Sequence, residues 1–273
     1  MNSNLLKNEQ IKKLFDENRE KLLSADITTP VKQNGICFDG IIDEEEFDKC
    51  AKKVIFLLKE TNGNSTIKSD DGTNKTGLPE ALPDWDYRKW LQEQQAYGYE
   101  SYNGFDSSRF YGFTFNKICM WVDVFCDCLS GVDESFDDYK KSRYNETNFR
   151  NILRRIGVVN LKKTWGSAST KWSDLYSYLH QENNKTPLDV LRKEIEIIKP
   201  DIVICGGEQV FDFAQEIFCG EVCSMKVTDG TRFRYFKNED MVFLDFYHPS
   251  CRKSIQKSYN YAKMRFNVIK QIL

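Results

Sequence analysis

The chain has 273 residues, with 39 basic and 41 acidic side chains and a formal net charge of −2. Hydrophobic residues make up 40% of it and aromatic residues 14%, which provides for a packed core and excludes an intrinsically disordered chain. The charge balance excludes a generally basic protein that coats nucleic acid, so any contact with nucleic acid must be local. No apolar run approaches the roughly 18–20 residues needed to span a bilayer, and the N-terminus lacks the apolar segment of a secretion signal. We therefore expect a cytoplasmic protein.

The nine cysteines are an odd number and are scattered along the chain. Without a secretion signal, this usage indicates reduced thiols rather than disulfides. Two close pairs, Cys126–Cys128 and Cys219–Cys223, have the spacing of metal ligands, but both lie in largely apolar, helical segments and the chain has only two histidines. Buried thiols are the favoured interpretation. We expect no metal and no cofactor.

The first half of the chain predicts helices, one buried strand and a long polar segment. Residues 4–23 have the apolar periodicity of a helix. Residues 54–58 form a continuous apolar run of strand length, which is typical of a parallel strand buried on both faces. Residues 61–84 are polar and rich in turn residues, which predicts a long loop or insert. An apolar stretch of helix length follows at residues 109–130.

The second half of the chain alternates helices with apolar strands. A helix is predicted to begin at Thr186-Pro187, because proline is favoured at the first helical position, and to stop at Pro200. The C-terminal residues 259–273 also predict a helix. The predicted strands are residues 157–161, 201–205 and 241–247, the last of them in a hairpin with residues 231–236.

This alternation predicts a three-layer α/β/α sandwich with a central four-stranded, mostly parallel sheet. In this interpretation residues 52–273 form the α/β domain. Residues 1–51 form an N-terminal helical extension packed on the same domain. No internal repeat and no linker divides the chain.

Polar residues or glycines follow each of the predicted parallel strands. In open parallel sheets, binding sites form at the carboxyl ends of the strands. Taken singly, each of these segments is more often a turn or a helix cap. Their occurrence together favours a site on which Glu60, Asn160 and His248 converge. The segments are 59–63, 160–163, 206–207 and 248–251.

The first two segments resemble motifs of the uracil-DNA glycosylase superfamily, nearest to its thermostable bacterial and archaeal type. That type has a first motif Gly-Glu-Ala-Pro-Gly, which Lys59-Glu-Thr-Asn-Gly matches at Glu60 and Gly63. Its Thr-Asn-Val-Val-Lys strand is similar to residues 159–163, Val-Asn-Leu-Lys-Lys. The first motif here lacks the leading glycine and the proline. Glycosylases of that type hold an iron–sulfur cluster with cysteines, one of which follows this strand. Thr164 stands near the position of that cysteine here, so we expect no iron–sulfur cluster.

The last two segments extend the resemblance over residues 52–273. Residues 200–206 resemble the third strand of the family, and His248-Pro-Ser250 resembles its final motif. The resemblance implies a uracil-DNA glycosylase-like fold, with a mainly parallel four-stranded sheet between helices. It also implies an enzyme of DNA repair that flips a uracil, or another deaminated base, into a pocket and hydrolyses its N-glycosidic bond.

The resemblance also implies roles for individual residues. Asn160 would pair with O4 and N3–H of uracil, because an amide offers both an acceptor and a donor. His248 would donate a hydrogen bond to O2 and stabilise the leaving base. Glu60 would orient the attacking water, and Gly63 would allow the backbone to approach closely.

Further contacts with DNA are expected around this site. Tyr111 or Phe113 would stack on the base, and Ser250 lies in the loop that follows the final motif. Residues 246–273 carry six cations and no acid, which favours local contact with phosphates. A second basic stretch covers residues 150–171. The cations expected on the DNA backbone are Lys162, Lys163 and Arg252.

Two other functions remain open at this point. One is a non-catalytic protein of the same fold that binds DNA or a nucleobase, which the altered first motif favours. The other is an unrelated α/β hydrolase or nucleotide-binding protein, although no Gly-x-Ser-x-Gly elbow or phosphate loop is present. The expected partner is DNA, single- or double-stranded, with no membrane, and the protein is expected to be a monomer.

Overall fold

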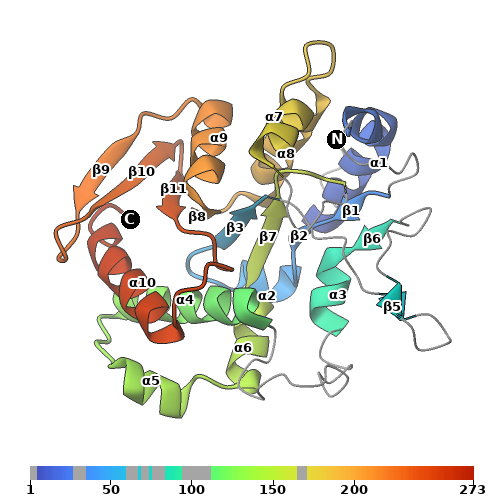
Figure 1. Ribbon diagram of the computed structural model, residues 1–273. Helices are drawn as coiled ribbons and strands as arrows, with labels where there is room; N and C mark the ends of the chain where they lie inside the picture. Colours follow the sequence, from blue (N-terminus) through green and yellow to red (C-terminus); the bar gives the residue numbers. More distant parts are fainter. Residues whose placement is uncertain are drawn as a thin grey trace.

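Four parallel strands occupy the centre of the main sheet (Figure 1). The computed structural model of the chain describes residues 5–26, 35–59, 67–68, 74–75, 84–93, 112–164 and 171–273. The four strands coincide closely with the apolar runs predicted from the sequence. Their order across the sheet is β7 (Ile156–Asn160), β3 (Val54–Leu58), β8 (Ile202–Gly206) and β11 (Met241–Phe246).

Three antiparallel strands extend this centre into a mixed sheet of seven strands. The α/β class is therefore confirmed, whereas the expected sheet of four strands is corrected to seven. The added strands carry no long apolar run: one has two residues, and β9 is largely exposed. They are β2 (Gly40–Ile41) beside β7, β10 (Arg232–Asn238) beside β11, and β9 (Cys223–Lys226) beside β10.

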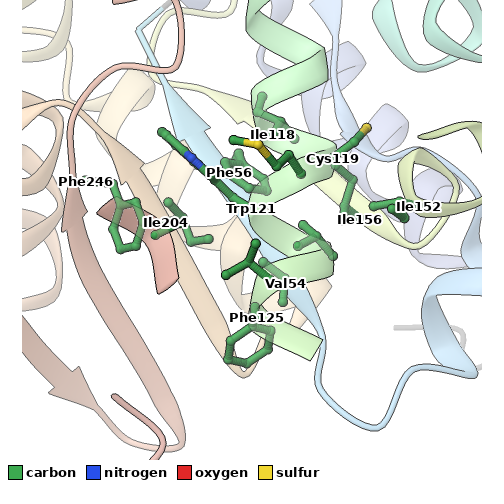
Figure 2. Close-up of a cluster of buried hydrophobic side chains, with 14 of the residues drawn as sticks. Val54, Phe56, Ile118, Cys119, Trp121, Phe125, Ile152, Ile156, Ile204 and Phe246 are labelled. Atoms are coloured by element: carbon green, nitrogen blue, oxygen red, sulfur yellow. The ribbon is translucent and has the colours of Figure 1, made fainter. Parts of the chain in front are cut away.

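Both faces of the central strands are buried, because successive side chains of a strand point to opposite faces. In β3, Val54 and Phe56 face one hydrophobic cluster, and Ile55 and Leu57 face the other. Figure 2 shows Val54 and Phe56 beside Trp121, within the first of these clusters. Burial on both faces explains why this strand is a continuous apolar run rather than an alternating one.

Helices cover each face of the sheet (Figure 1). One layer packs on the cluster around Trp121, and the other packs on the cluster around Phe211. The first layer contains α4 (Gly112–Ser130), α5 (Phe136–Ser142), α6 (Glu146–Leu153) and α10 (Ile255–Ile269). The second contains α1 (Lys7–Ala25), α7 (Trp172–Leu179), α8 (Thr186–Ile198) and α9 (Glu208–Phe218).

The bounds of α8 follow the signals in its sequence. Pro187 lies in its first turn, where a missing N–H costs nothing. Lys199, immediately after the helix, has a left-handed backbone conformation, and Pro200 follows it. A proline cannot continue a helix, so the chain turns directly into β8.

The N-terminal segment contributes more than the expected helix. Its β2 joins the main sheet, and β1 (Cys37–Phe38) pairs in parallel with β6 (Trp85–Asp86). The described part of the polar 61–84 segment includes a small antiparallel pair. The remaining elements are β4 (Ile67–Lys68), β5 (Asn74–Lys75), α2 (Glu44–Asp48) and α3 (Tyr87–Glu93).

None of the helices in the described ranges is long and apolar enough to cross a membrane.

Candidate functional site

The order of the central strands places a switch point between β3 and β8. After β3 the chain continues to β7 on one side, and after β8 it continues to β11 on the other side. Such a reversal leaves a crevice outside the carboxyl ends of the two adjacent strands. Leu58 pairs with Asn160, and Gly206 pairs with Phe246, so the four strands end close to one level. The polar segments predicted from the sequence therefore share one edge of the sheet.

Close packing joins the ends of β3, β8 and β11 at this edge. A methyl group on Gly206 would lie 2.7 Å from Cδ2 of Leu58 and 3.4 Å from Cδ of Pro249. The next residue, Gly207, has a φ of +122°, which L side chains rarely adopt, and it caps the start of α9. The two glycines thus allow the turn after β8 to lie against the His248-Pro249 segment.

His248 is a neutral hydrogen-bond donor at this edge. Its Nδ1 accepts a hydrogen bond from the backbone N–H of Ser250 at 3.2 Å and lies 2.6 Å from the Ser250 Oγ. Because Nδ1 faces an N–H, it carries no proton, and the single proton of the neutral ring is on Nε2. Burial lowers the pKa of His248 to about 4, and the charges of Lys59 and Lys117 lower it as well. The ring therefore presents an Nε2–H donor throughout the neutral pH range.

Two lysines give this donor a positive environment. Lys117, on α4, is buried, and its Nζ donates to the carbonyl oxygen of Cys251 at 2.5 Å. Burial lowers the pKa of Lys117 to about 8. Lys59 immediately follows β3, and its Nζ lies 4.1 Å from the centre of the Trp172 ring. An anion that forms beside His248 would be stabilised by both charges.

The two lysines were not among the residues predicted from the sequence. Lys59 stands where the resembling motif has its leading glycine, and that departure was the available signal. Lys117 lies in an otherwise apolar stretch of α4. Lysine is almost never fully buried unless it has a partner, so a lysine at this position was a second signal of a functional residue.

Asn160 is the last residue of β7, and only 1% of it is exposed. One carboxylate oxygen of Asp39, Oδ2, accepts hydrogen bonds from its backbone N at 2.5 Å and from its side-chain Nδ2 at 3.0 Å. Asp39 lies between β1 and β2, in the N-terminal segment that the resemblance does not cover. The expected base-reading amide is thus held by a residue that sequence reasoning missed.

The expectation that Lys162 and Lys163 contact DNA phosphates is corrected. Lys163 has no exposed side-chain surface, and its Nζ pairs with Asp39 at 3.0 Å and also with Glu194 of α8. Nζ of Lys162 lies 3.1 Å from Asp26, and both of these side chains are 2% exposed. Buried cations paired with carboxylates are not available to a phosphate.

Two further cations of the second basic stretch are also paired with acids. Arg150 pairs with Glu146, and Arg154 lies 2.8 Å from Asp43. The acidic segment at residues 39–48 thus supplies Asp43 to Arg154 and Asp39 to Lys163. Net charge along the sequence did not reveal this pairing.

The loop after β11 carries exposed polar and cationic side chains. Ser250, Arg252 and Lys253 are exposed and follow His248 directly. Nζ of Lys253 lies 4.1 Å from the centre of the Tyr247 ring, which holds this cation beside the loop. Exposed cations next to a candidate site are suited to contacts with phosphates.

Other expected site residues fall outside the described part of the chain. Glu60, Gly63 and Tyr111 belong to this group. Phe113 lies in the first turn of α4, but its side chain is also outside the description. The structure thus places Asn160 and the segment from His248 to Arg252 at one edge of the sheet.

The cysteines divide into buried and exposed thiols. Cys128 is buried, but Cys126, Cys219 and Cys223 are exposed, so the expectation of buried thiols in the two close pairs is wrong for these three. Over the ranges the structure describes, no group of three or more His, Cys, Asp or Glu residues is arranged to hold a metal ion.

Comparisons of the chain with protein-family models, curated proteins and solved structures gave no match. What the site does is therefore argued from its own geometry and chemistry.

Proposed function

We propose that this protein is a DNA glycosylase of the uracil-DNA glycosylase type, which hydrolyses the N-glycosidic bond of uracil or another deaminated base. The observation that carries the proposal is the neutral Nε2–H donor of His248, which feels the charges of Lys59 and Lys117 and lies at the same strand edge as Asn160. Four parallel strands at the centre of the sheet, with helices on both faces, also support the proposal.

The chemistry of base removal explains this combination of groups. Breaking the glycosidic bond leaves negative charge on the departing base and positive charge on the sugar. A donor aimed at the oxygen that gains charge stabilises the transition state more than the ground state. His248 supplies the donor, while Lys59 and Lys117 supply a positive field that is strengthened by burial. Glu60, which follows Lys59 in the chain, has the carboxylate that the sugar cation and the water require.

The spacing of the strands suits a base held between Asn160 and His248. Strands β7 and β11 are separated by two others, which places them about 14 Å apart. Two hydrogen bonds account for about 6 Å of this distance. A pyrimidine ring and the reach of two side chains fill the remainder.

Binding of a base by this amide requires movement, because only 1% of Asn160 is exposed. Segments that cover it must open when DNA binds. Arg252 and Lys253 are exposed beside His248 and would hold the phosphates during this step.

The decisive experiment is cleavage of uracil-containing single- and double-stranded oligonucleotides, followed by alkali treatment to break abasic sites. We expect cleavage by the wild type and its loss in Asn160→Ala and His248→Ala. Arg154→Ala is the control, because Arg154 precedes the amino end of β7, at the opposite edge of the sheet. If the wild type cleaves neither uracil nor hypoxanthine nor xanthine substrates, the enzymatic proposal is wrong.

The burial of Asn160 favours one second candidate, a non-catalytic protein of this fold that binds DNA or a nucleobase. This candidate predicts that the wild type binds uracil-containing oligonucleotides without cleaving them. Binding that depends on Arg252 and Lys253, together with no release of free base, would establish it.

A further inference from the structure

Asp39 fixes the orientation of the Asn160 side chain. Its Oδ2 accepts from both the backbone N and the Nδ2 of Asn160, at 2.5 and 3.0 Å. Lys163 donates to both oxygens of the same carboxylate, at 3.0 and 3.1 Å. Asp39 and Lys163 have no exposed surface, so water does not compete for these hydrogen bonds.

A carboxylate imposes one of the two orientations of an amide. The oxygen and nitrogen of an asparagine side chain have nearly the same shape, and an unrestrained amide can exchange them by rotation. The Asp39 oxygens accept hydrogen bonds from Lys163 and from the Asn160 backbone, so they act as acceptors here. Only the nitrogen of the Asn160 amide can face such a group. Rotation would place two oxygens in contact in a buried site, which is costly.

A fixed amide distinguishes two classes of nucleobase edge. Uracil and hypoxanthine present a carbonyl oxygen beside a ring N–H, whereas cytosine and adenine present an amino group beside an unprotonated ring nitrogen. Hydrolytic deamination converts the second pattern into the first. The glycosidic bond sets the direction from which a base enters, so the order of acceptor and donor on Asn160 has to match. An amide that can rotate would accept both patterns.

We infer that Asp39 is a positioning residue that makes Asn160 selective for bases with a carbonyl beside a ring N–H, and that it excludes their amino-bearing parents. This inference rests on the proposed function for its substrate, and on the Asp39–Asn160 hydrogen bonds for its mechanism. Asp39 belongs to the N-terminal segment, so this segment is part of the specificity of the site.

The first test measures binding of oligonucleotides that carry 2′-fluorinated deoxyuridine or deoxycytidine, whose glycosidic bonds resist cleavage. The wild type is expected to prefer the uracil probe. Asp39→Asn can offer either an oxygen or a nitrogen to Asn160, so this preference should fall by about 10-fold or more. Glu194→Gln is the matched control, because it changes the other buried carboxylate that pairs with Lys163 and keeps the carboxylate of Asp39. Equal changes of preference in both variants would overturn the inference.

The second test needs no enzymatic activity. In ¹⁵N-resolved NMR of the wild type, the Nδ2 protons of Asn160 should exchange slowly with water, because one of them is held by a buried carboxylate. The signal is assigned by its absence in Asn160→Ala. Rapid exchange of both protons with water would overturn the inference. Absence of base cleavage by the wild type would overturn the proposed function instead, so the two failures are distinguishable.

Discussion

At the scale of single residues, burial and neighbouring charges determine the protonation states of several ionisable groups in and around the candidate site. His248 is kept neutral, and Lys163 is kept charged between two buried acids. Burial raises the pKa of Glu194 well above its usual range. Each state has a consequence for stability, since a buried charge without a partner is expensive.

His248 makes the free energy of unfolding depend on pH in the acidic range. Its pKa is about 4 in the folded state and 6.5 without the perturbation. Between these values the unfolded chain binds more protons, so the free energy of unfolding should fall as the pH drops from about 6.5 to about 4, by at most about 1.4 kcal/mol per pH unit. Urea titrations at several pH values would measure this. His248→Gln should remove this part of the slope, and an unchanged slope would contradict the assignment.

Lys163 should matter more for folding than for DNA binding. Lys163→Met leaves Asp39 and Glu194 without their shared cation, and we expect a loss of about 3–5 kcal/mol in the free energy of unfolding. Lys12→Met is the control, because Lys12 and Asp16 form an exposed pair worth about 1 kcal/mol or less. Chemical denaturation measures both losses. If the two variants lost equally little free energy of unfolding, the buried pairing would not be formed.

At the scale of elements, the sequence predicted the four strands that are buried on both faces and the hairpin strand β10, and it missed β2 and β9. The strand at residues 54–58 could be predicted because each of its side chains is apolar. Strand β2 has only two residues, and its partner β7 lies more than a hundred residues later in the chain, so no local pattern marks it. The lysines of residues 162–163 were misread for the same reason, since their acidic partners are distant in sequence.

The contact between β2 and β7 depends on Gly157. A methyl group there would lie 2.9 Å from Cγ2 of Ile55 and 3.3 Å from the carbonyl oxygen of Gly40. Gly157→Ala should therefore destabilise the fold by about 1–3 kcal/mol and loosen β2. Hydrogen exchange of the Gly40–Ile41 amides would report the loosening. Lys140→Ala, at an exposed position of α5, should leave these amides unchanged.

At the scale of the whole molecule, an acidic protein presents a small cationic surface beside the candidate site. The formal net charge is −2, yet Arg252 and Lys253 are exposed next to His248. The six cations of residues 246–273 suggested a broad basic face. In the structure Lys263 pairs with Asp133, and Arg265 is buried against Tyr261, so two of these six cations are not available to a partner.

Binding of DNA should accordingly depend on salt with a shallow slope. Arg252→Ala should weaken binding to any sequence and reduce the slope of log affinity against log salt concentration by about 1. Arg154→Ala removes the same charge at the opposite edge of the sheet and should leave the slope unchanged. Fluorescence anisotropy of a labelled oligonucleotide over a range of salt concentrations would measure both. Equal slopes for Arg252→Ala and the wild type would show that Arg252 does not contact the phosphates of DNA.

The hydrogen bonds that Asn160 donates to Asp39 join residues that are 121 positions apart. During synthesis the N-terminal segment leaves the ribosome long before β7 exists, and it must wait for its partner. The closing of so long a loop is entropically costly, and it is offset only once the central strands have assembled. The amide that would read the base is therefore set late in folding, and partial unfolding of the N-terminal segment would release it first, while the parallel strands remain intact.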